Sequence, residues 1–323
     1  MLDFNAIHQQ KIIVVGDIML DAYLFGTVDR ISPEAPVPVV NHKHEEYRLG
    51  GAANVALNIA AMGAIPVTIG VTGNDADAVK MHMVFEKRNI STAFLVKETD
   101  RPTTVKTRII GNNHQLLRVD KESTHTITPE TKKQVLENVM KALPDAKALI
   151  LEDYDKGLLD EELITQIVDA CNTARVPVVV DPKKRNFLSY KNVTLFKPNL
   201  KEIKEGLKLH SLDSMREIEE AAKQLLQQLN LRYIMVTLSE RGVLICDAQH
   251  TLHFPAHVRK IADVSGAGDT VVSIAALCLA QQLPAAEIAV LSNLAGGLVC
   301  EEVGVVPINK EMFEQEALRL IKA

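Results

Sequence analysis

The stretch that most constrains this sequence is residues 263–269, Asp-Val-Ser-Gly-Ala-Gly-Asp, which an apolar run follows directly. Its two glycines, Gly266 and Gly268, leave the backbone free of side-chain crowding, so neighbouring N–H groups can turn toward one point. The run at 270–279 predicts a helix, and a helix start gathers unpaired N–H donors at the positive end of its dipole. The stretch therefore predicts an anion-binding loop with the carboxylate of Asp269 at its mouth.

An anion-binding loop beside a carboxylate has the two parts that phosphoryl transfer to a hydroxyl group requires. The amides of Gly266, Ala267 and Gly268 would hold the transferred charge, and Asp269 would accept the proton. The same residues also fit a plain glycine turn in which Asp269 is only a helix-start residue. Taken alone, the motif does not distinguish these two interpretations.

Most of the remaining chain alternates between apolar strands and helices. A continuous apolar run at 11–16 predicts a strand buried on both faces, and Asp17 and Asp21 follow it. The alternation from residue 129 onward predicts a mainly parallel sheet with helices on both faces. Open sheets of this kind bind ligands at the carboxyl ends of their strands, where polar residues recur in this sequence. The expected strands are 11–16, 67–71, 148–151, 176–180, 193–196 and 233–237, the expected helices are 50–62, 77–87, 129–142, 160–174, 214–229, 270–279 and 288–299, and a hairpin is expected at 242–254.

Two segments outside this alternation, about 37–49 and 92–120, predict a small β lid. The first segment is short and polar, and the prolines at 30–38 exclude a helix just before it. The second segment contains alternating, β-branched stretches that are typical of strands. Lys106, Arg108 and Arg118 alternate along the lid strands, so they could share a face that holds an anion. Ordinary surface charge is the simpler explanation of these three residues taken alone. Exposed lid edges also invite pairing with a second copy, so we expect a homodimer through the lid.

Composition narrows the class of protein. A chain of 323 residues that is 47% hydrophobic can bury a large core, and its net charge of −5 offers no electrostatic footprint for nucleic acid. The sequence shows no signal peptide and no apolar run near the roughly 20 residues that span a bilayer, so we expect a cytoplasmic protein without membrane contact. The widely spaced cysteines are expected to be reduced core residues: Cys171, Cys246, Cys278 and Cys300.

Further motifs are candidates for nucleotide binding. Asn199-Leu200-Lys201-Glu202 places an amide and a carboxylate three residues apart at a helix start, which fits a capping box. It also fits a second function, in which Glu202 holds a hydrated Mg²⁺ through water beside nucleotide phosphates. Thr237 ends an expected strand and Gly242 lies in the turn that follows it. Asn293 lies on an apolar helix, where it could contact an adenine or be a buried amide. A P-loop motif is absent.

Three of these regions resemble the signatures of a known enzyme family. Gly50-Gly51-Ala52-Ala53-Asn54 and residues 263–269 are similar to the two signature regions of the ribokinase-like (PfkB) carbohydrate kinases. Residues 199–202 are similar to the N-x-x-E motif of that family, and the resemblance covers essentially the whole chain. It implies an α/β fold, a ribokinase-like three-layer sandwich with a mainly parallel central sheet and a small β lid, and it implies ATP-dependent sugar kinase activity.

The resemblance also implies a role for each matching residue. Asp269 matches the catalytic base, and the loop at 266–268 matches the anion hole. Residues 199–202 match the motif for ATP and Mg²⁺, and Thr237, Gly242 and Asn293 fall where the family binds nucleotide. The implied sugar-binding positions, with Asp21 added for its place after the first strand, are Asp17, Asp21, Gly50, Gly51 and Asn54.

A narrower resemblance, in residues 16–21, 30–39 and 50–56, is to the branch of the family that phosphorylates a heptose 7-phosphate. It implies transfer to the anomeric (C1) hydroxyl to give the 1,7-bisphosphate, a precursor of ADP-heptose for lipopolysaccharide core. The expected cations for the 7-phosphate are Lys106, Arg108, Arg118 and Lys183. The alternatives are a kinase for another phosphosugar, such as fructose 1-phosphate, and an inactive nucleotide-sensing protein.

The sequence departs from the family pattern at two points. Ser265 stands where the family usually has Thr, and because the hydroxyl is kept we expect little effect. The chain ends at Ala323 without the H-x-G-H motif of the nucleotidyltransferase domain that often follows this kinase. We therefore expect a single kinase domain over 1–323, with adenylyl transfer assigned to another polypeptide or to a part of a longer chain. The expected cofactors are ATP and Mg²⁺, with a monovalent cation as a further candidate.

Overall fold

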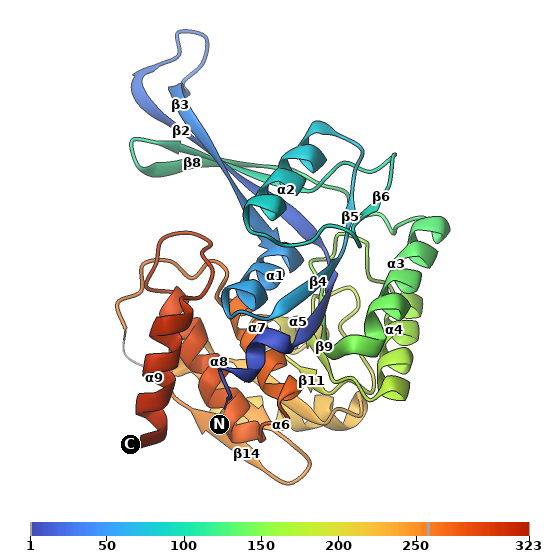
Figure 1. Cartoon of the computed structure of the whole chain (residues 1–323). Helices are drawn as coiled ribbons and strands as arrows, with labels where there is room; N and C mark the ends of the chain where they lie inside the picture. Colours follow the sequence, from blue (N-terminus) through green and yellow to red (C-terminus); the bar gives the residue numbers. More distant parts are fainter. Residues whose placement is uncertain (1, 257–258, 323) are drawn as a thin grey trace.

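The centre of the protein is an eight-stranded sheet, seen in a computed structural model that describes residues 2–256 and 259–322 (Figure 1). The strand order is β14-β13-β12-β11-β10-β9-β1-β4, and pairing from β12 to β4 is parallel, whereas β13 and β14 add an antiparallel edge. The strands are β1 (Lys11–Gly16), β4 (Ile65–Ile69), β9 (Ala146–Glu152), β10 (Val178–Asp181), β11 (Leu195–Phe196), β12 (Tyr233–Thr237), β13 (Val243–Cys246) and β14 (Thr251–Phe254).

Helices cover both faces of this sheet, because its central strands are apolar on both sides. On β9, Ala148 and Ile150 belong to one core cluster, and Leu149 and Leu151 belong to the other. The first face is covered by α1 (Ala52–Ala61), α2 (Ala76–Lys87), α7 (Ala267–Ala280), α8 (Ala285–Val299) and α9 (Lys310–Lys322). The second is covered by α3 (Pro129–Ala142), α4 (Glu161–Ala174), α5 (Leu200–Gly206) and α6 (Met215–Gln228). Short 3₁₀ helices are η1 (Ala6–Gln9), η2 (Leu143–Asp145) and η3 (Ser239–Arg241).

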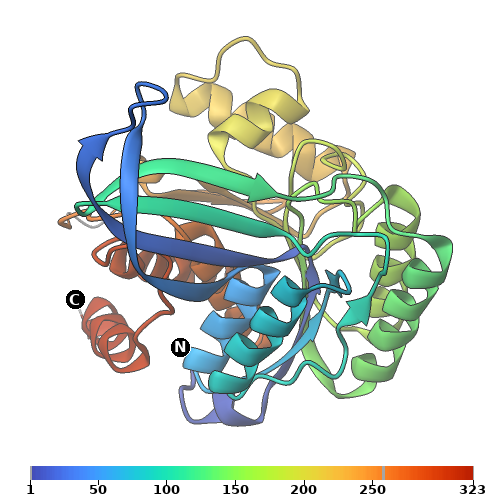
Figure 2. The same ribbon diagram turned by 90° about the horizontal axis from the view of Figure 1, so that it is seen from above.

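A second sheet of four strands, β3-β2-β7-β8, forms the lid. Figure 2 shows these strands running side by side as one layer, and in Figure 1 the β2–β3 hairpin extends well beyond β8. The lid is joined to the central fold at two points: β2 begins one residue after Asp17, and β3 leads directly into α1. Its strands are β2 (Ile18–Ile31), β3 (Pro38–Gly51), β7 (Val105–Gly111) and β8 (His114–Lys121).

The lid differs in two ways from the segments that the sequence indicated. It includes β2, a strand of 14 residues that pairs with both β3 and β7 and lies entirely outside the expected segments. The first part of the expected lid segment at 92–120 forms only β6 (Val96–Lys97), which pairs with β5 (Val71–Thr72) in a separate two-stranded sheet. Thus residues 105–121, and not the whole of 92–120, join the lid.

None of the helices in the described part of the chain combines the length and the apolar character that crossing a bilayer requires.

Candidate active site

The carboxyl ends of neighbouring strands bring four charged side chains to one edge of the central sheet. Asp17 follows β1, Glu152 ends β9, Asp181 ends β10 and Lys197 follows β11. Each of the four has at most 5% of its surface exposed. The residues two positions before Glu152, Asp181 and Lys197 belong to the core beneath α7, so alternation directs these three side chains to the α7 side of the sheet.

The glycine-rich turn begins α7 at this edge. Gly266 is the N-cap with φ of +81°, a left-handed conformation that favours glycine, and an added Cβ would lie 3.1 Å from Asn54 Nδ2. Within the described part of the chain, the amides of Gly266 and Gly268 have no hydrogen-bond partner. The amide of Ala267 donates to the Val264 carbonyl at 3.3 Å. Two of the three expected anion-hole donors are therefore unpaired, and the third makes one long hydrogen bond.

The carboxylate of Asp269, in the first turn of α7, is held from two sides. Its Oδ2 accepts a hydrogen bond from Asn54 Nδ2 of α1 at 2.7 Å, and its Oδ1 accepts one from the Tyr154 hydroxyl at 2.8 Å. The backbone amide of Tyr154 donates to Asp17 Oδ2 at 2.9 Å. Asp269 is thus linked to Asn54 directly and to Asp17 through Tyr154, so three residues expected at the site lie in one network.

Burial raises the pKa of Asp269 to about 6, and the nearby charge of Asp181 acts in the same direction. The hydrogen bonds from Asn54 and Tyr154 and the ammonium of Lys197 oppose this rise, because they stabilise the ionised form. A carboxyl group with a pKa close to the working pH can both hold and release a proton, which suits a general base.

Asp17 is also buried, and it holds the loop that follows β9. Its Oδ2 accepts hydrogen bonds from the amides of Tyr154 and Lys156 at 2.9 and 3.0 Å, and its Oδ1 accepts one from Leu158 at 3.4 Å. Burial, and then repulsion from Asp153, raises the pKa of Asp17 to about 6, although these amides lower it. The sequence did not indicate this structural role for Asp17.

The other expected sugar-binding residues gather where β2 and β3 meet the central sheet. Gly51 has φ of +57°, and a Cβ there would overlap the Asp17 carbonyl, so a side chain would close this junction. At Gly50 an added Cβ would overlap the Asp21 carboxylate. Asp21 itself is buried and forms an ion pair with Arg108 of the neighbouring strand β7.

The three expected lid cations share one face, because Lys106 and Arg108 alternate along β7 and Arg118 pairs with Arg108 across to β8. None of the three is without an acidic neighbour. Lys106 lies 3.1 Å and Arg118 lies 2.8 Å from the carboxylate of Asp120, and half of the Arg118 side chain is exposed. A phosphate on this face would have to compete with these acids.

The fourth expected phosphate-binding cation, Lys183, follows β10 of the central sheet and, among the described residues, shares no acidic partner with the lid cations. Its ammonium forms an ion pair with Glu202 and lies 3.8 Å from Asp181 Oδ1. This position associates Lys183 with the Asn199–Glu202 motif and not with the lid cations.

The Asn199–Glu202 motif forms a complete capping box at the start of α5. Asn199 Oδ1 accepts a hydrogen bond from the Glu202 amide, and Glu202 Oε2 accepts one from the Asn199 amide, both at 2.9 Å. Leu200 packs against the core, whereas the Lys201 side chain is 83% exposed and points along the helix toward Glu205. Since both Glu202 oxygens have protein partners, Glu202 fits a cation held through water, not one bound directly.

The remaining nucleotide candidates lie close to this motif and to the end of β14. Thr237 pairs with Asn199 through an isolated bridge. Gly242 has φ of +89°, and a Cβ there would overlap the Phe254 carbonyl. Asn293 donates a hydrogen bond to the Pro255 carbonyl at 2.9 Å, so its amide holds the loop after β14.

Four residues of the site had no role assigned from the sequence: the buried Glu152, Asp181 and Lys197, and the half-buried Tyr154. Each lies at or within two residues of the end of a strand. The available signal was the polar run that follows each apolar strand. That signal marks an edge of the sheet, but it does not say which side chains turn toward α7.

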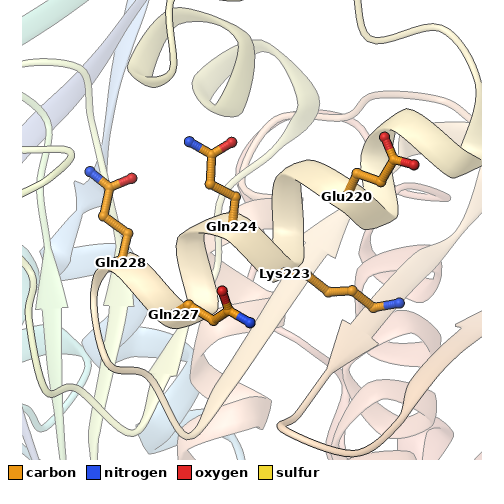
Figure 3. Close-up of a pocket in the computed structure, with 5 residues that line it drawn as sticks. All are labelled: Glu220, Lys223, Gln224, Gln227 and Gln228. Atoms are coloured by element: carbon orange, nitrogen blue, oxygen red, sulfur yellow. The ribbon is translucent and has the colours of Figure 1, made fainter.

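A hollow lies elsewhere on the surface, over α6, and its lining comes from this one helix (Figure 3). Its side chains project outward from the helix, so it is an open surface and not a cleft between elements. The lining residues are Glu220, Lys223, Gln224, Gln227 and Gln228.

Comparison with known sequences gives a family match over most of the chain. The model for the pfkB family of carbohydrate kinases matches residues 9–311. Bifunctional protein HldE of Methylobacillus flagellatus is 42% identical over 306 residues, which is 94% of this chain and 62% of that protein. The protein of the same name from Proteus mirabilis is 40% identical over 314 residues, 96% of this chain and 64% of its own length. The chain thus spans less than two thirds of these curated relatives.

Solved structures with the same fold confirm the expected α/β architecture with its mainly parallel sheet and β lid. Phosphofructokinase-2 of Escherichia coli in complex with potassium superposes with a TM-score of 0.81 at 19% identity, covering 97% of this chain and 99% of that one. Ribokinase of Arabidopsis thaliana, complexed with ribose and ATP, gives a TM-score of 0.73 at 16% identity, covering 98% and 99%.

Proposed function

Because the chain belongs to the pfkB family of carbohydrate kinases, we propose that it phosphorylates the anomeric (C1) hydroxyl of D-glycero-β-D-manno-heptose 7-phosphate with ATP. The product is the 1,7-bisphosphate, which feeds ADP-heptose and lipopolysaccharide core biosynthesis. The observation that carries this substrate is the identity of about 40%, over nearly the whole chain, to relatives named HldE. The resemblance of residues 16–21, 30–39 and 50–56 to heptose 7-phosphate kinases points the same way.

In the proposed mechanism, Asp269 removes the proton from the C1 hydroxyl. The hydrogen bonds from Asn54 and Tyr154 fix its carboxylate, so the reacting oxygen needs only to be brought within about 3 Å. The unpaired amides of Gly266 and Gly268, with that of Ala267, stabilise negative charge on the transferred phosphoryl group. Orientation and electrostatic stabilisation are the main contributions that phosphoryl transfer requires from a protein.

The sugar would lie at the junction between the lid and the central sheet. We propose that Asp17, Asp21 and Asn54 bind its hydroxyl groups, and that the bare backbone of Gly50 and Gly51 lets it approach closely. The lid face with its cations would take the 7-phosphate, at Lys106, Arg108 and Arg118. Closure of the lid would exclude water that otherwise hydrolyses ATP.

The nucleotide would lie beside α5 and β12. Kinases of this family use ATP and a metal ion. We propose Mg²⁺, whose charge offsets that of the phosphates when it is bound, with Glu202 holding it through water. Lys183, paired with Glu202, would contact the ATP phosphates, so we move it from the sugar phosphate to the nucleotide. Residues 199–202, Thr237, Gly242 and Asn293 complete the proposed nucleotide site, and a dependence on a monovalent cation is a further part of the proposal.

A homodimer through the lid is also part of the proposal. The lid has two long edge strands, β3 and β8, and its β8 carries exposed apolar side chains: Leu117 is 56% and Val119 is 50% exposed. Apolar side chains beside an open strand edge favour pairing with another copy of the sheet.

The test is a coupled assay of ADP release with a panel of phosphosugars. We expect heptose 7-phosphate to give a clearly higher kcat/KM than fructose 1-phosphate and the other acceptors. A higher kcat/KM for a different phosphosugar would support the kinase activity but replace heptose 7-phosphate as the proposed substrate. Absence of turnover with every acceptor would favour the alternative of a nucleotide-sensing protein without catalytic activity.

A further inference from the structure

Arg48 is a cation of the lid that has no part in the proposed mechanism. It lies on the same face of the lid as Lys106, because it pairs with Asp21 of β2 and Asp21 pairs with Lys106 of β7. The Arg48 side chain is 31% exposed, and the carboxylate of Glu46 lies 3.2 Å away. Its guanidinium carbon lies 4.7 Å from the centre of the Tyr23 ring, within the range of a cation–π contact. Arg48 is thus held by two neighbours in its own sheet.

The Arg48 guanidinium also reaches the central fold, at the backbone of a segment between α8 and α9. Gly304 has φ of +78°, and an added Cβ there would lie 2.6 Å from Arg48 Nη1 and 3.8 Å from the Tyr23 hydroxyl oxygen. Burial raises the pKa of that hydroxyl, and the charge of Arg48 and the Val305 amide, which donates to its oxygen, oppose the rise. A side chain at position 304 would displace Arg48, so glycine lets the lid rest directly on the backbone here.

The same segment contacts the glycine-rich turn before α7. The Gly304 amide donates to Asp263 Oδ2 at 3.0 Å, and the Ser265 amide donates to Asp263 Oδ1 at 2.9 Å. An added Cβ at Gly266 would lie 3.3 Å from Val305 Cγ1, so Val305 packs beside the N-cap of α7. One short segment therefore touches both the lid and the turn that carries the anion-hole amides.

We propose that Arg48 is a positioning residue that acts through Gly304 and Val305 on the anion-hole amides. This inference rests on the proposed function, which assigns those amides to the transferred phosphoryl group. While the lid lies over the site, Arg48 supports the segment and the segment supports the turn. The unpaired amides of Gly266 and Gly268 then keep the direction that the transferred group requires. Arg48 thereby links the position of the lid to the transfer step, and not to the affinity for either substrate.

Steady-state kinetics of the full chain, with ATP and the best acceptor of the phosphosugar panel, test the transfer step. Arg48→Gln should lower kcat by about tenfold or more and leave both KM values within about twofold, because the orientation of the amides is lost while the substrate contacts stay. Arg216→Gln is the matched control, since Arg216 also pairs with one glutamate, Glu220 at 2.9 Å, but lies on α6. It should keep the wild-type kcat. A raised KM for the sugar with an unchanged kcat in Arg48→Gln would overturn the proposal.

Hydrogen exchange followed by mass spectrometry, without ATP or sugar, tests the contact itself. In Arg48→Gln we expect faster exchange in residues 260–272 and 298–306, which hydrogen bonds such as that of the Gly304 amide join together. Exchange in α3 should stay as in the wild type, which separates local loosening from a loss of global stability. Unchanged exchange in both segments of the folded variant would overturn the proposal as well.

Gly304→Ala disturbs the same contact from the other side, because its Cβ would displace Arg48. The two substitutions combined should lower kcat by less than the product of their separate effects, since both remove one contact. A combined loss equal to that product would contradict the proposal. The two kinds of failure are distinguishable: absence of turnover with every acceptor counts against the proposed function, whereas unchanged exchange counts against the role of Arg48.

Discussion

Burial of the Asp269 carboxyl makes its ionised form less favourable, and this raises its pKa. Its carboxylate lies where water cannot solvate it, and only Asn54, Tyr154 and the Lys197 charge favour ionisation. The resulting pKa of about 6 leaves the group mostly ionised at neutral pH and still able to take up a proton, as its proposed role of general base requires.

We expect Asp269→Asn to retain ATP binding and to lower kcat by about 10² to 10⁴, because the base is lost while the surrounding donors stay. The variant should also be more stable at pH 8. A carboxyl group whose pKa is higher in the folded than in the unfolded protein lowers the free energy of unfolding at a pH above its folded pKa. Two pKa units correspond to about 3 kcal/mol, and the hydrogen bonds that the amide loses reduce the gain in the variant. Coupled ADP release, ATP titration and urea unfolding measure these effects. Near-normal turnover in this variant would refute the assignment of the base.

Activity should fall on the acid side as Asp269 becomes protonated, so kcat/KM for the sugar should decline below pH of about 6. Tyr154 donates to the ionised form and lowers the pKa of Asp269. Tyr154→Phe should therefore move the acid limb of the profile to higher pH. Tyr190→Phe removes another tyrosine hydroxyl, which is fully buried and donates to Asp153 at 2.6 Å, and should leave the limb in place. Identical profiles for both variants would contradict this role of Tyr154.

At the scale of elements, helix starts do much of the positioning. The N-terminus of α7 presents the unpaired amides, α1 follows its N-cap Gly51 and carries Asn54, and α5 follows its N-cap Asn199. In each case a short local sequence fixes the helix start, and the central sheet decides where that start lies.

The two capping boxes found among the described residues separate a structural role of Asn199 from a functional one. Asn199 caps α5 and Ser214 caps α6, each paired with a Glu three residues later. Replacement of either cap by Ala should lower the free energy of unfolding by about 1 kcal/mol. Only Asn199→Ala should also raise KM for ATP, because Ser214 lies outside the proposed nucleotide site. Equal KM values for the two variants would leave Asn199 as a cap alone.

Elements with local signals were predicted well from the sequence. The helix expected at 129–142 is found at Pro129–Ala142, because Thr128 caps it and Pro129 suits its first turn. In contrast, β2 was missed as a single strand of 14 residues. Its first six residues are buried, the next five are half-buried and the last three are exposed, so no regular alternation marks it, and its pairing with β3 and β7 is not encoded locally.

The residues of the site were likewise predicted only where a local sequence signal marks them. The glycine turns, Asp269 and Asn54 were recognisable, and the structure brings Asp269 and Asn54 into contact, although their catalytic roles remain predictions. Glu152 and Lys197 were not recognisable as site residues. Their importance depends on strands β9 and β11 ending at one edge with the same facing, which only the assembled sheet determines.

At the scale of the whole molecule, the lid predicts the oligomeric state. We expect two copies of the 35.6 kDa chain to associate through β8 and its apolar side chains. A Leu117→Asp and Val119→Asp double variant should be monomeric, because charges at the paired edge oppose association. Met140→Asp is the control, since Met140 is 52% exposed on α3, away from the lid. Size-exclusion chromatography with light scattering gives the mass, and a monomeric wild type would contradict the proposal.

The two long lid strands connect the far tip of the lid to the residues around Asp269. β2 and β3 each contain 14 residues, so each arm is about 45 Å long, and a swing of about 10° at its base moves the tip by about 8 Å. At their bases, β2 begins next to Asp17, and β3 ends at Gly51, just before the helix that carries Asn54. A displacement of the far tip would therefore be transmitted toward Asn54, which donates to Asp269 directly, and toward Asp17, which is linked to Asp269 through Tyr154.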